Sequence, residues 1–192
     1  MSTNWRESII QPKELIQWVH LFPDATFNDL WENTDITDPI WLPHLAQAGG
    51  ATRQQLISAS CSIARPCLTL IPEIEDQDKL RIALETAEAW CRGEVSKNLV
   101  RTARKDIGTI PYGSADLSYA AKAICTATCA ITAKAEHTYS ASFSAAHTAY
   151  FALQAGVDSK LMCATIRKHF NFVQKPREKR LTLWQRLAID LQ

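Results

Sequence analysis

The chain has 192 residues, of which 46% are hydrophobic and 21% are charged, and its formal net charge is +1. This composition is ordinary for a globular protein that is long enough to bury a core. No stretch approaches the roughly 20 apolar residues that cross a bilayer, and the opening MSTNWRESIIQPKE lacks a secretory pattern. We therefore expect a cytoplasmic protein without a membrane segment.

Residues 1–50 read as short helices separated by FPDAT, TDITDP and AGG. Seven acidic side chains in this segment stand against Arg6 and Lys13, a net charge of −5. Residues 158–192 carry eight basic and three acidic side chains, a net charge of +5. We expect residues 1–50 to pack on a bundle formed by residues 51–192, so that the chain makes one structural domain.

The next segment, TRQQLISASCSIARPCLTLIP, predicts a helix that Pro66 interrupts or kinks, because proline lacks the backbone N–H that a helix interior needs. Between residues 78 and 92, Leu80, Leu84 and Ala87 recur at helical spacing, and Gly93 follows as a stop signal. No segment alternates apolar and polar residues as a strand does. The pattern predicts an all-α, multi-helix bundle.

A second helix is predicted from Ser96, its N-cap, to Gly108. The segment TIPYGSAD then reads as a turn, in which Ser114 or Asp116 caps the following helix. These signals place one short helix between the glycine stop at residue 93 and the alanine-rich region that follows.

The stretch from Ala120 to Tyr150 is dominated by alanine, serine and threonine. We expect two helices joined near residues 134–138, forming a central antiparallel hairpin. The second helix carries two stripes of residues at helical spacing. We expect the side chains of one stripe to fill space and the small side chains of the other to let a neighbouring helix approach closely. The first stripe is Tyr139, Phe143, Ala146, Tyr150 and Leu153; the second is Ala141, Ala145, Thr148, Ala152 and Ala155.

Cysteines and histidines in this stretch raise the question of a metal site. Cys125 and Cys129 share a helix face, but His137 and His147 are about 15 Å apart along one helix and cannot bind the same ion. We interpret His147 as a partly buried histidine that a neighbouring acceptor satisfies. The cysteines are expected to be buried free thiols, at positions 61, 67, 91, 125, 129 and 163.

Sequence signatures of catalysis are missing as well. The chain has no glycine-rich phosphate loop, no Gly-x-Ser-x-Gly elbow and no His-Glu-x-x-His pair. We expect a protein that is not an enzyme and that needs neither a cofactor nor a metal.

The order of segments resembles a known family. ARPCLTLIP, KLRIALETAEAWCRGE, a short basic helix and an alanine-rich pair with SAAHTAYFALQAG follow one another. This order resembles the fifth family of immunity proteins from bacterial polymorphic toxin systems, over roughly residues 60–157. In that family a Glu-Ala-Trp-hydrophobic-Arg-Gly-Glu stretch precedes alanine-rich helices with a histidine. Residues 88–94 match that stretch, including Glu88, Trp90, Gly93 and Glu94, and His147 matches the histidine.

The resemblance implies inhibition by binding: an immunity protein blocks the active site of a cognate toxin, or its access to substrate, without catalysis. We interpret the matched residues as mainly structural, with Trp90 packing, Gly93 ending a helix and Glu94 capping the next one. Direct contact with the toxin is the alternative for these residues.

Acidic clusters are the predicted contact surface if the toxin is a nuclease, since they can imitate nucleic acid in a basic groove. One cluster is Glu73, Glu75, Asp76 and Asp78; the other is Asp24, Asp29, Glu32, Asp35 and Asp38. For the first cluster, a solvated loop that complements the following helix is the other interpretation. Exposed members among Trp5, Trp18, Trp31 and Trp41 could act as hot spots, although we expect most of them in the core.

The C-terminal region suggests a second function, nucleic-acid binding. Its basic residues are Arg167, Lys168, Lys175, Arg177, Lys179, Arg180 and Arg186, with Phe170, Phe172 and Trp184 among them. The segment LTLWQRLAIDL, however, places Leu181, Trp184, Leu187, Ala188 and Leu191 on one face. A helix that docks on the bundle with its arginines outward is therefore the simpler interpretation.

Overall fold

The protein, seen in a computed structural model, is built from helices. The structure describes residues 5–33, 36–71, 77–107, 118–132 and 138–170. These residues form α1 (Lys13–His20), α2 (Phe27–Trp31), α3 (Trp41–Ala48), α4 (Arg53–Ala64), α5 (Gln77–Cys91), α6 (Lys97–Ile107), α7 (Tyr119–Thr132), α8 (Thr138–Gln154) and α9 (Ser159–His169). Two 3₁₀ helices span Trp5–Ser8 and Arg65–Leu70, and no strand occurs in these ranges. The predicted all-α class is confirmed.

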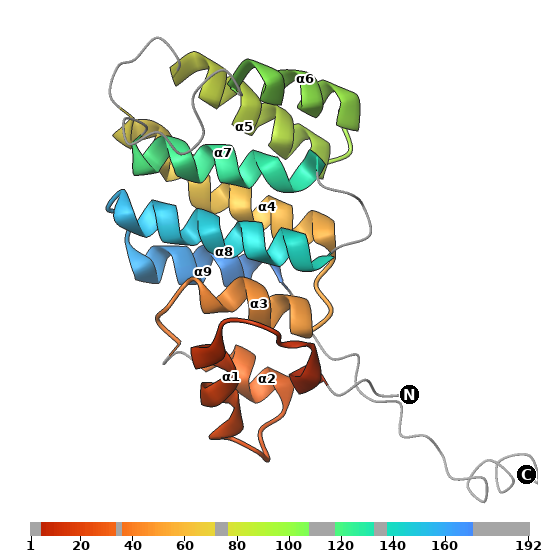
Figure 1. Ribbon diagram of the computed structural model, residues 1–192, viewed down its shortest axis with the longest axis vertical. Coiled ribbons are helices and arrows are strands. Elements are labelled where there is room, and N and C mark those ends of the chain that lie inside the picture. Colours follow the sequence, from red (N-terminus) through yellow and green to blue (C-terminus); the bar gives the residue numbers. More distant parts are fainter. Residues whose placement is uncertain (1–4, 34–35, 72–76, 108–117, 133–137, 171–192) are drawn as a thin grey trace, which may run out of the picture.

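The helices are stacked in tiers (Figure 1). The pair α5 and α6 forms one end, α7 follows, and α4 and α8 occupy the middle, in contact with each other. α7 packs along α8, and α9 and α3 lie on the far side of this central group. The short helices α1 and α2 cover the opposite end. None of the helices in the described ranges is long and apolar enough to cross a membrane.

The end of α5 forms as its sequence predicts. Gly93 has a φ of +79°, the left-handed conformation that favours glycine. Its N–H donates to Trp90 O at 2.9 Å and the Glu94 N–H donates to Ala89 O at 2.9 Å, the two bonds that close a helix in this way. Ser96 then begins α6, since its Oγ accepts from the Leu99 N–H at 3.4 Å.

Other helix boundaries follow local signals in part. α4 ends at Ala64 and the chain continues as a 3₁₀ helix through Pro66, as expected for a proline there. α7 begins at Tyr119, and Ser118 is its cap: Ser118 Oγ accepts from the Ala121 N–H at 3.2 Å. The predicted cap at Ser114 or Asp116 was wrong, because the helix starts after both, and those residues lie outside the described ranges.

Small side chains hold α8 against its neighbours. Ala141, Ala145, Thr148 and Ala152 are fully buried, so the expected close approach is confirmed for this stripe. Thr148 Oγ1 donates to Ser144 O at 2.9 Å, which removes the cost of burying the hydroxyl.

The aromatic stripe of α8 does not fill space as predicted. Phe143 and Tyr150 are each 42% exposed, because the face that meets α4 and α7 has room for small side chains and the large rings lie outward. Tyr139 lies among the side chains that the structure does not describe.

Residues 5–48 are joined to the rest through α3 and through aromatic contacts. α3 packs against α8 and α9. Trp31 is 2% exposed and meets Phe170 edge to face, with ring centroids 5.8 Å apart. Trp5, Trp18 and Trp41 are half-buried against the same core. The expected core position is therefore confirmed for Trp31, and none of the four is an exposed hot spot.

Candidate functional site

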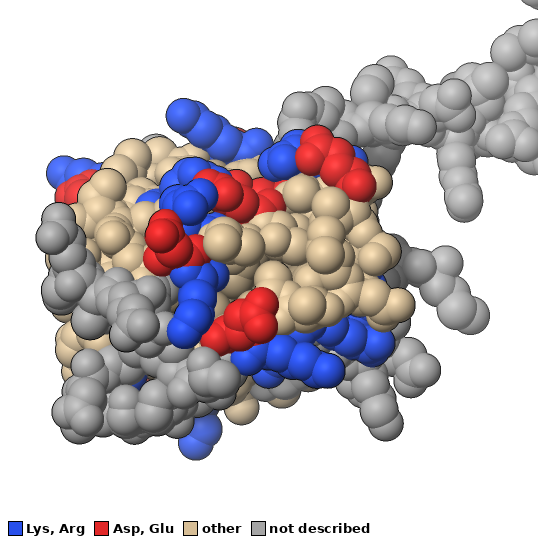
Figure 2. All heavy atoms as spheres, turned by 90° about the horizontal axis from the view of Figure 1, so that it is seen from above, with Lys and Arg blue, Asp and Glu red and all other residues tan. Residues whose placement is uncertain are grey.

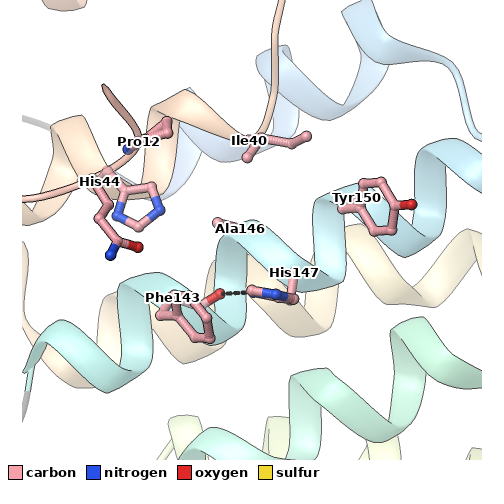
Figure 3. Close-up of a pocket in the computed structure, with 8 residues that line it drawn as sticks. Pro12, Ile40, His44, Phe143, Ala146, His147 and Tyr150 are labelled. Atoms are coloured by element: carbon pink, nitrogen blue, oxygen red, sulfur yellow. Dashed lines mark hydrogen bonds between the residues drawn. The ribbon is translucent and has the colours of Figure 1, made fainter. Parts of the chain in front are cut away.

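A cavity of about 230 Å³ lies between α3 and α8 (Figure 3). The segment before α1 closes one side of it. Its lining is Gln11, Pro12, Ile40, His44, Phe143, Ala146, His147 and Tyr150. Residues from three distant parts of the sequence thus meet at one place, which is the strongest candidate for a binding site in the described part of the chain.

α8 supplies one wall through residues at helical spacing. Phe143, His147 and Tyr150 are four and three residues apart, so they share a face. The Phe143 and His147 rings lie 4.1 Å apart, centroid to centroid. His147 Nδ1 donates to Phe143 O at 3.0 Å (Figure 3), because a carbonyl oxygen can only accept. His147 is half-buried, and its expected satisfaction by a neighbouring acceptor is confirmed.

α3 supplies the opposite wall through His44, which projects toward α8 (Figure 3). Leu42, Leu45 and Ala46 of the same helix are fully buried in the core, which fixes the side of α3 that meets the cavity. Beside the cavity, Ser142 Oγ donates to Gln47 Oε1 at 2.7 Å and ties α8 to α3.

His44 is buried but keeps its polar atoms available. It is 5% exposed, and it makes no hydrogen bond to the residues that the structure describes. Burial, with a smaller contribution from the positive charge of a protonated His147, lowers its pKa to about 4. His44 is therefore a neutral imidazole at physiological pH, with one N–H donor and one acceptor nitrogen directed at the cavity.

The lining of this cavity has few polar groups. Its walls are mainly apolar and aromatic, and the described residues contain no group of three His, Cys, Asp or Glu side chains placed to hold a metal. Cys125 is buried, which raises its pKa to about 12, so it is a poor thiolate ligand.

The segment that carries the family resemblance lies elsewhere, on α5 and the turn after it. Glu88 accepts from Arg65 Nε at 2.8 Å, and Trp90 is half-buried against the core. Glu94 pairs with Arg92, whose Nε is 2.6 Å from its Oε1. Glu94 therefore does not cap α6 as predicted; that role belongs to Ser96.

Three of the described acidic residues predicted to contact the toxin form hydrogen bonds or an ion pair within this chain. Asp29 accepts from the Thr26 hydroxyl and from the Thr26 N–H, each at 2.7 Å, in the capping box of α2, and the hydroxyl bond, followed by the backbone bond, lowers its pKa. Asp38 Oδ1 accepts from the Ile40 N–H at 2.9 Å, and Asp78 meets Arg81 Nη2 at 3.0 Å. Asp24 and Glu32 are exposed. Glu73, Glu75, Asp76 and Asp35 lie outside the described ranges.

Charges of both signs share the end of the molecule formed by α5 and α6. Figure 2 shows acidic and basic side chains interleaved there. They include the pairs of Arg81 with Asp78 and Glu85, and of Arg92 with Glu94.

Arg167, the first basic residue of the predicted nucleic-acid-binding region, forms hydrogen bonds to the backbone of this chain. Its Nη2 donates to Asn33 O at 2.9 Å and its Nε donates to Trp31 O at 3.3 Å. Lys168 is exposed, and Phe170 is 3% exposed in the core. The remaining basic residues, Phe172 and the predicted LTLWQRLAIDL helix lie in 171–192, outside the described residues.

The six cysteines are free thiols, as predicted. Cys61, Cys67, Cys125 and Cys163 are buried, whereas Cys91 and Cys129 are half-buried. Cys61 on α4 and Cys91 on α5 interact: the Cys61 S–H donates to the Cys91 sulfur, which lowers the pKa of Cys91 and raises that of Cys61.

Comparison of the chain with family models, with curated proteins and with solved structures finds no match.

His44 could not be recognised as a site residue from the sequence. The residue stands in the segment WLPHLAQAGG, and nothing in its spacing marks it. The signal that was available is the position of a histidine among buried apolar residues of a short helix. Its partner across the cavity is 103 positions away, from 44 to 147, and periodicity carries no information on such a contact.

Proposed function

We propose that this protein is a non-enzymatic inhibitor that neutralises a cognate bacterial toxin by binding it, as an immunity protein does. The resemblance of residues 60–157 to that family supports this function. The observation that carries it is the surface of α8 at the cavity, where Phe143 and Tyr150 are each 42% exposed on either side of His147. Exposed aromatic side chains beside a cavity are typical of the hot spots of protein interfaces.

His147 links the resemblance to this surface, because it is the family-like histidine and also lines the cavity. Glu88 and Glu94 have ion-pair partners on this chain, Arg65 and Arg92, and Gly93 closes a helix. The toxin contact therefore belongs to the α3–α8 surface, and the Glu88–Glu94 stretch supports the fold. The two acidic clusters remain a predicted contribution to the rate of association.

The test is co-expression with the protein encoded by the neighbouring gene, since toxin and immunity genes usually lie together in the family that this chain resembles. We expect the tagged protein to be recovered in a stoichiometric complex with that product and to restore the growth of cells that express it. Leu99→Ala is a matched control, because Leu99 on α6 is 50% exposed and far in the fold from the cavity. Recovery of nucleic acid without a protein partner, or failure to restore growth, would refute the proposal.

A further inference from the structure

The lining of the cavity between α3 and α8 has no carboxylate and no Lys or Arg side chain. None of its eight lining residues is Asp, Glu, Lys or Arg, and burial keeps His44 neutral at physiological pH. A charged group that entered would lose water and find no counter-charge, which is costly in an apolar site. The lining therefore selects a neutral group.

His44 defines where the polar atom of that group must lie. His44 is only 5% exposed, it has no hydrogen bond to the described residues, and its ring projects into the cavity (Figure 3). A buried imidazole without a hydrogen-bond partner is energetically unfavourable, so a ligand that supplies this hydrogen bond binds more tightly. An O–H or N–H group that reaches His44 would supply the missing bond.

The shape of the cavity adds a size limit. About 230 Å³ is available, and a cavity of about 150 Å³ already holds benzene. Pro12, Ile40 and Phe143 provide apolar surface for a flat ring. One aromatic ring with a single polar group fits both the volume and the lining.

The rim of the cavity indicates that this ring belongs to a larger molecule. Phe143 and Tyr150 remain 42% exposed on α8, and Figure 3 shows the Tyr150 hydroxyl directed away from His44. A free ring inside the cavity would leave this apolar rim in water, whereas a protein surface that carries the ring would cover it.

We infer that the cavity receives a tyrosine or tryptophan side chain of the partner protein, with its O–H or N–H bonded to His44 and its ring beside Phe143. The identity of the partner as a protein rests on the proposed function. The inference that the occupant is an aromatic ring with an O–H or N–H group rests on the cavity alone. An experiment can therefore disprove the ring and the protein partner independently.

The test uses the purified full chain and small neutral probes, followed through the imidazole NMR signals of His44 and His147. N-acetyltyrosinamide and N-acetyltryptophanamide should perturb both histidines. N-acetylphenylalaninamide, which lacks the O–H, should bind about tenfold more weakly than the tyrosine probe, the effect of one buried hydrogen bond. In His44→Leu, which keeps the apolar volume, this preference should disappear.

Phe143→Ala provides a second variant, since it removes a partly exposed ring and should weaken all three probes, whereas Leu99→Ala should change none. Equal affinity for the tyrosine and phenylalanine probes in the wild-type protein, or no binding of any probe at millimolar concentration, would overturn the inference even if a toxin complex forms. Tight binding of free 4-methylphenol with no binding of the peptide-like probes would also overturn it, because the occupant would then be a small molecule.

Discussion

His44 on α3 and His147 on α8 line one cavity from opposite sides, and burial together with a positive charge on His147 lowers the pKa of His44. The two imidazoles differ in their partners. His147 donates to Phe143 O within its own helix, whereas His44 has no hydrogen bond to the described residues. The site thus combines one oriented imidazole with one that is free to bind a ligand.

Folding should become less favourable in mild acid because of His44. Its pKa is about 4 in the folded protein and 6.5 when exposed, so the unfolded chain takes up a proton first as the pH falls. The stability is fully present above pH 6.5 and is lost between pH 6.5 and about 4, by at most about 3 kcal/mol. Urea unfolding at a series of pH values measures this loss.

The matched variants for this experiment are His44→Gln and His20→Gln. His44→Gln should flatten the pH dependence, leaving the smaller loss from His169, whose pKa is also lowered by burial. His20 is exposed, so its substitution should leave the curve unchanged. A pH profile that is the same in His44→Gln and in the wild type would show that His44 is not held neutral.

Cys91 should be the most reactive thiol of the native protein. The hydrogen bond from Cys61 lowers its pKa, and it is half-buried, whereas burial raises the pKa of Cys67 to about 11. A disulfide reagent such as Ellman's reagent should show one fast phase at mild alkaline pH. Cys91→Ser should remove that phase and Cys129→Ser should keep it. A fast phase that survives in Cys91→Ser would contradict the assignment.

Gly93→Ala should destabilise the protein by about 1 kcal/mol, because alanine disfavours the φ of +79° at this position. No atom lies within 4 Å of the place that a Cβ would occupy, so the cost is one of backbone conformation. Gly93→Asn should cost less, since asparagine adopts this conformation more readily. Equal losses for the two variants in urea unfolding would argue against this explanation.

Local signals predicted much of the fold. Gly93, Ser96 and Pro66 set helix ends through their own backbone chemistry, which the sequence displays directly. The cap of α7 is Ser118 and not Ser114 or Asp116, because the sequence offers several residues that can cap a helix within five positions and does not distinguish among them.

The site was harder to predict. The spacing of Phe143 and Tyr150 placed them on one face, but it could not say whether that face is inside or outside, because the small residues of α8 form an equally good packing stripe. His44 became visible only when α3 was placed against α8. Contacts between distant segments depend on the whole packing arrangement, and sequence periodicity reports on one helix at a time.

Arg167→Met should loosen the attachment of α9 to the segment after α2. Two guanidinium nitrogens of Arg167 donate to the backbone oxygens of Trp31 and Asn33, and methionine keeps much of the aliphatic volume without these bonds. We expect a loss of roughly 2 kcal/mol, since partly buried carbonyl oxygens lose a charged donor. Lys168→Met is the control, because Lys168 is exposed. Equal stability of both variants would show that Arg167 does not hold this segment.

The most direct test of the whole account is the affinity of the purified toxin for three forms of this protein, measured by calorimetry: wild type, Phe143→Ala and Leu99→Ala. Binding through the α8 surface predicts a loss of about tenfold or more for Phe143→Ala and no change for Leu99→Ala. The same affinity for all three forms would place the contact elsewhere and contradict the proposed site. No binding of the toxin by the wild-type protein would contradict the proposed function.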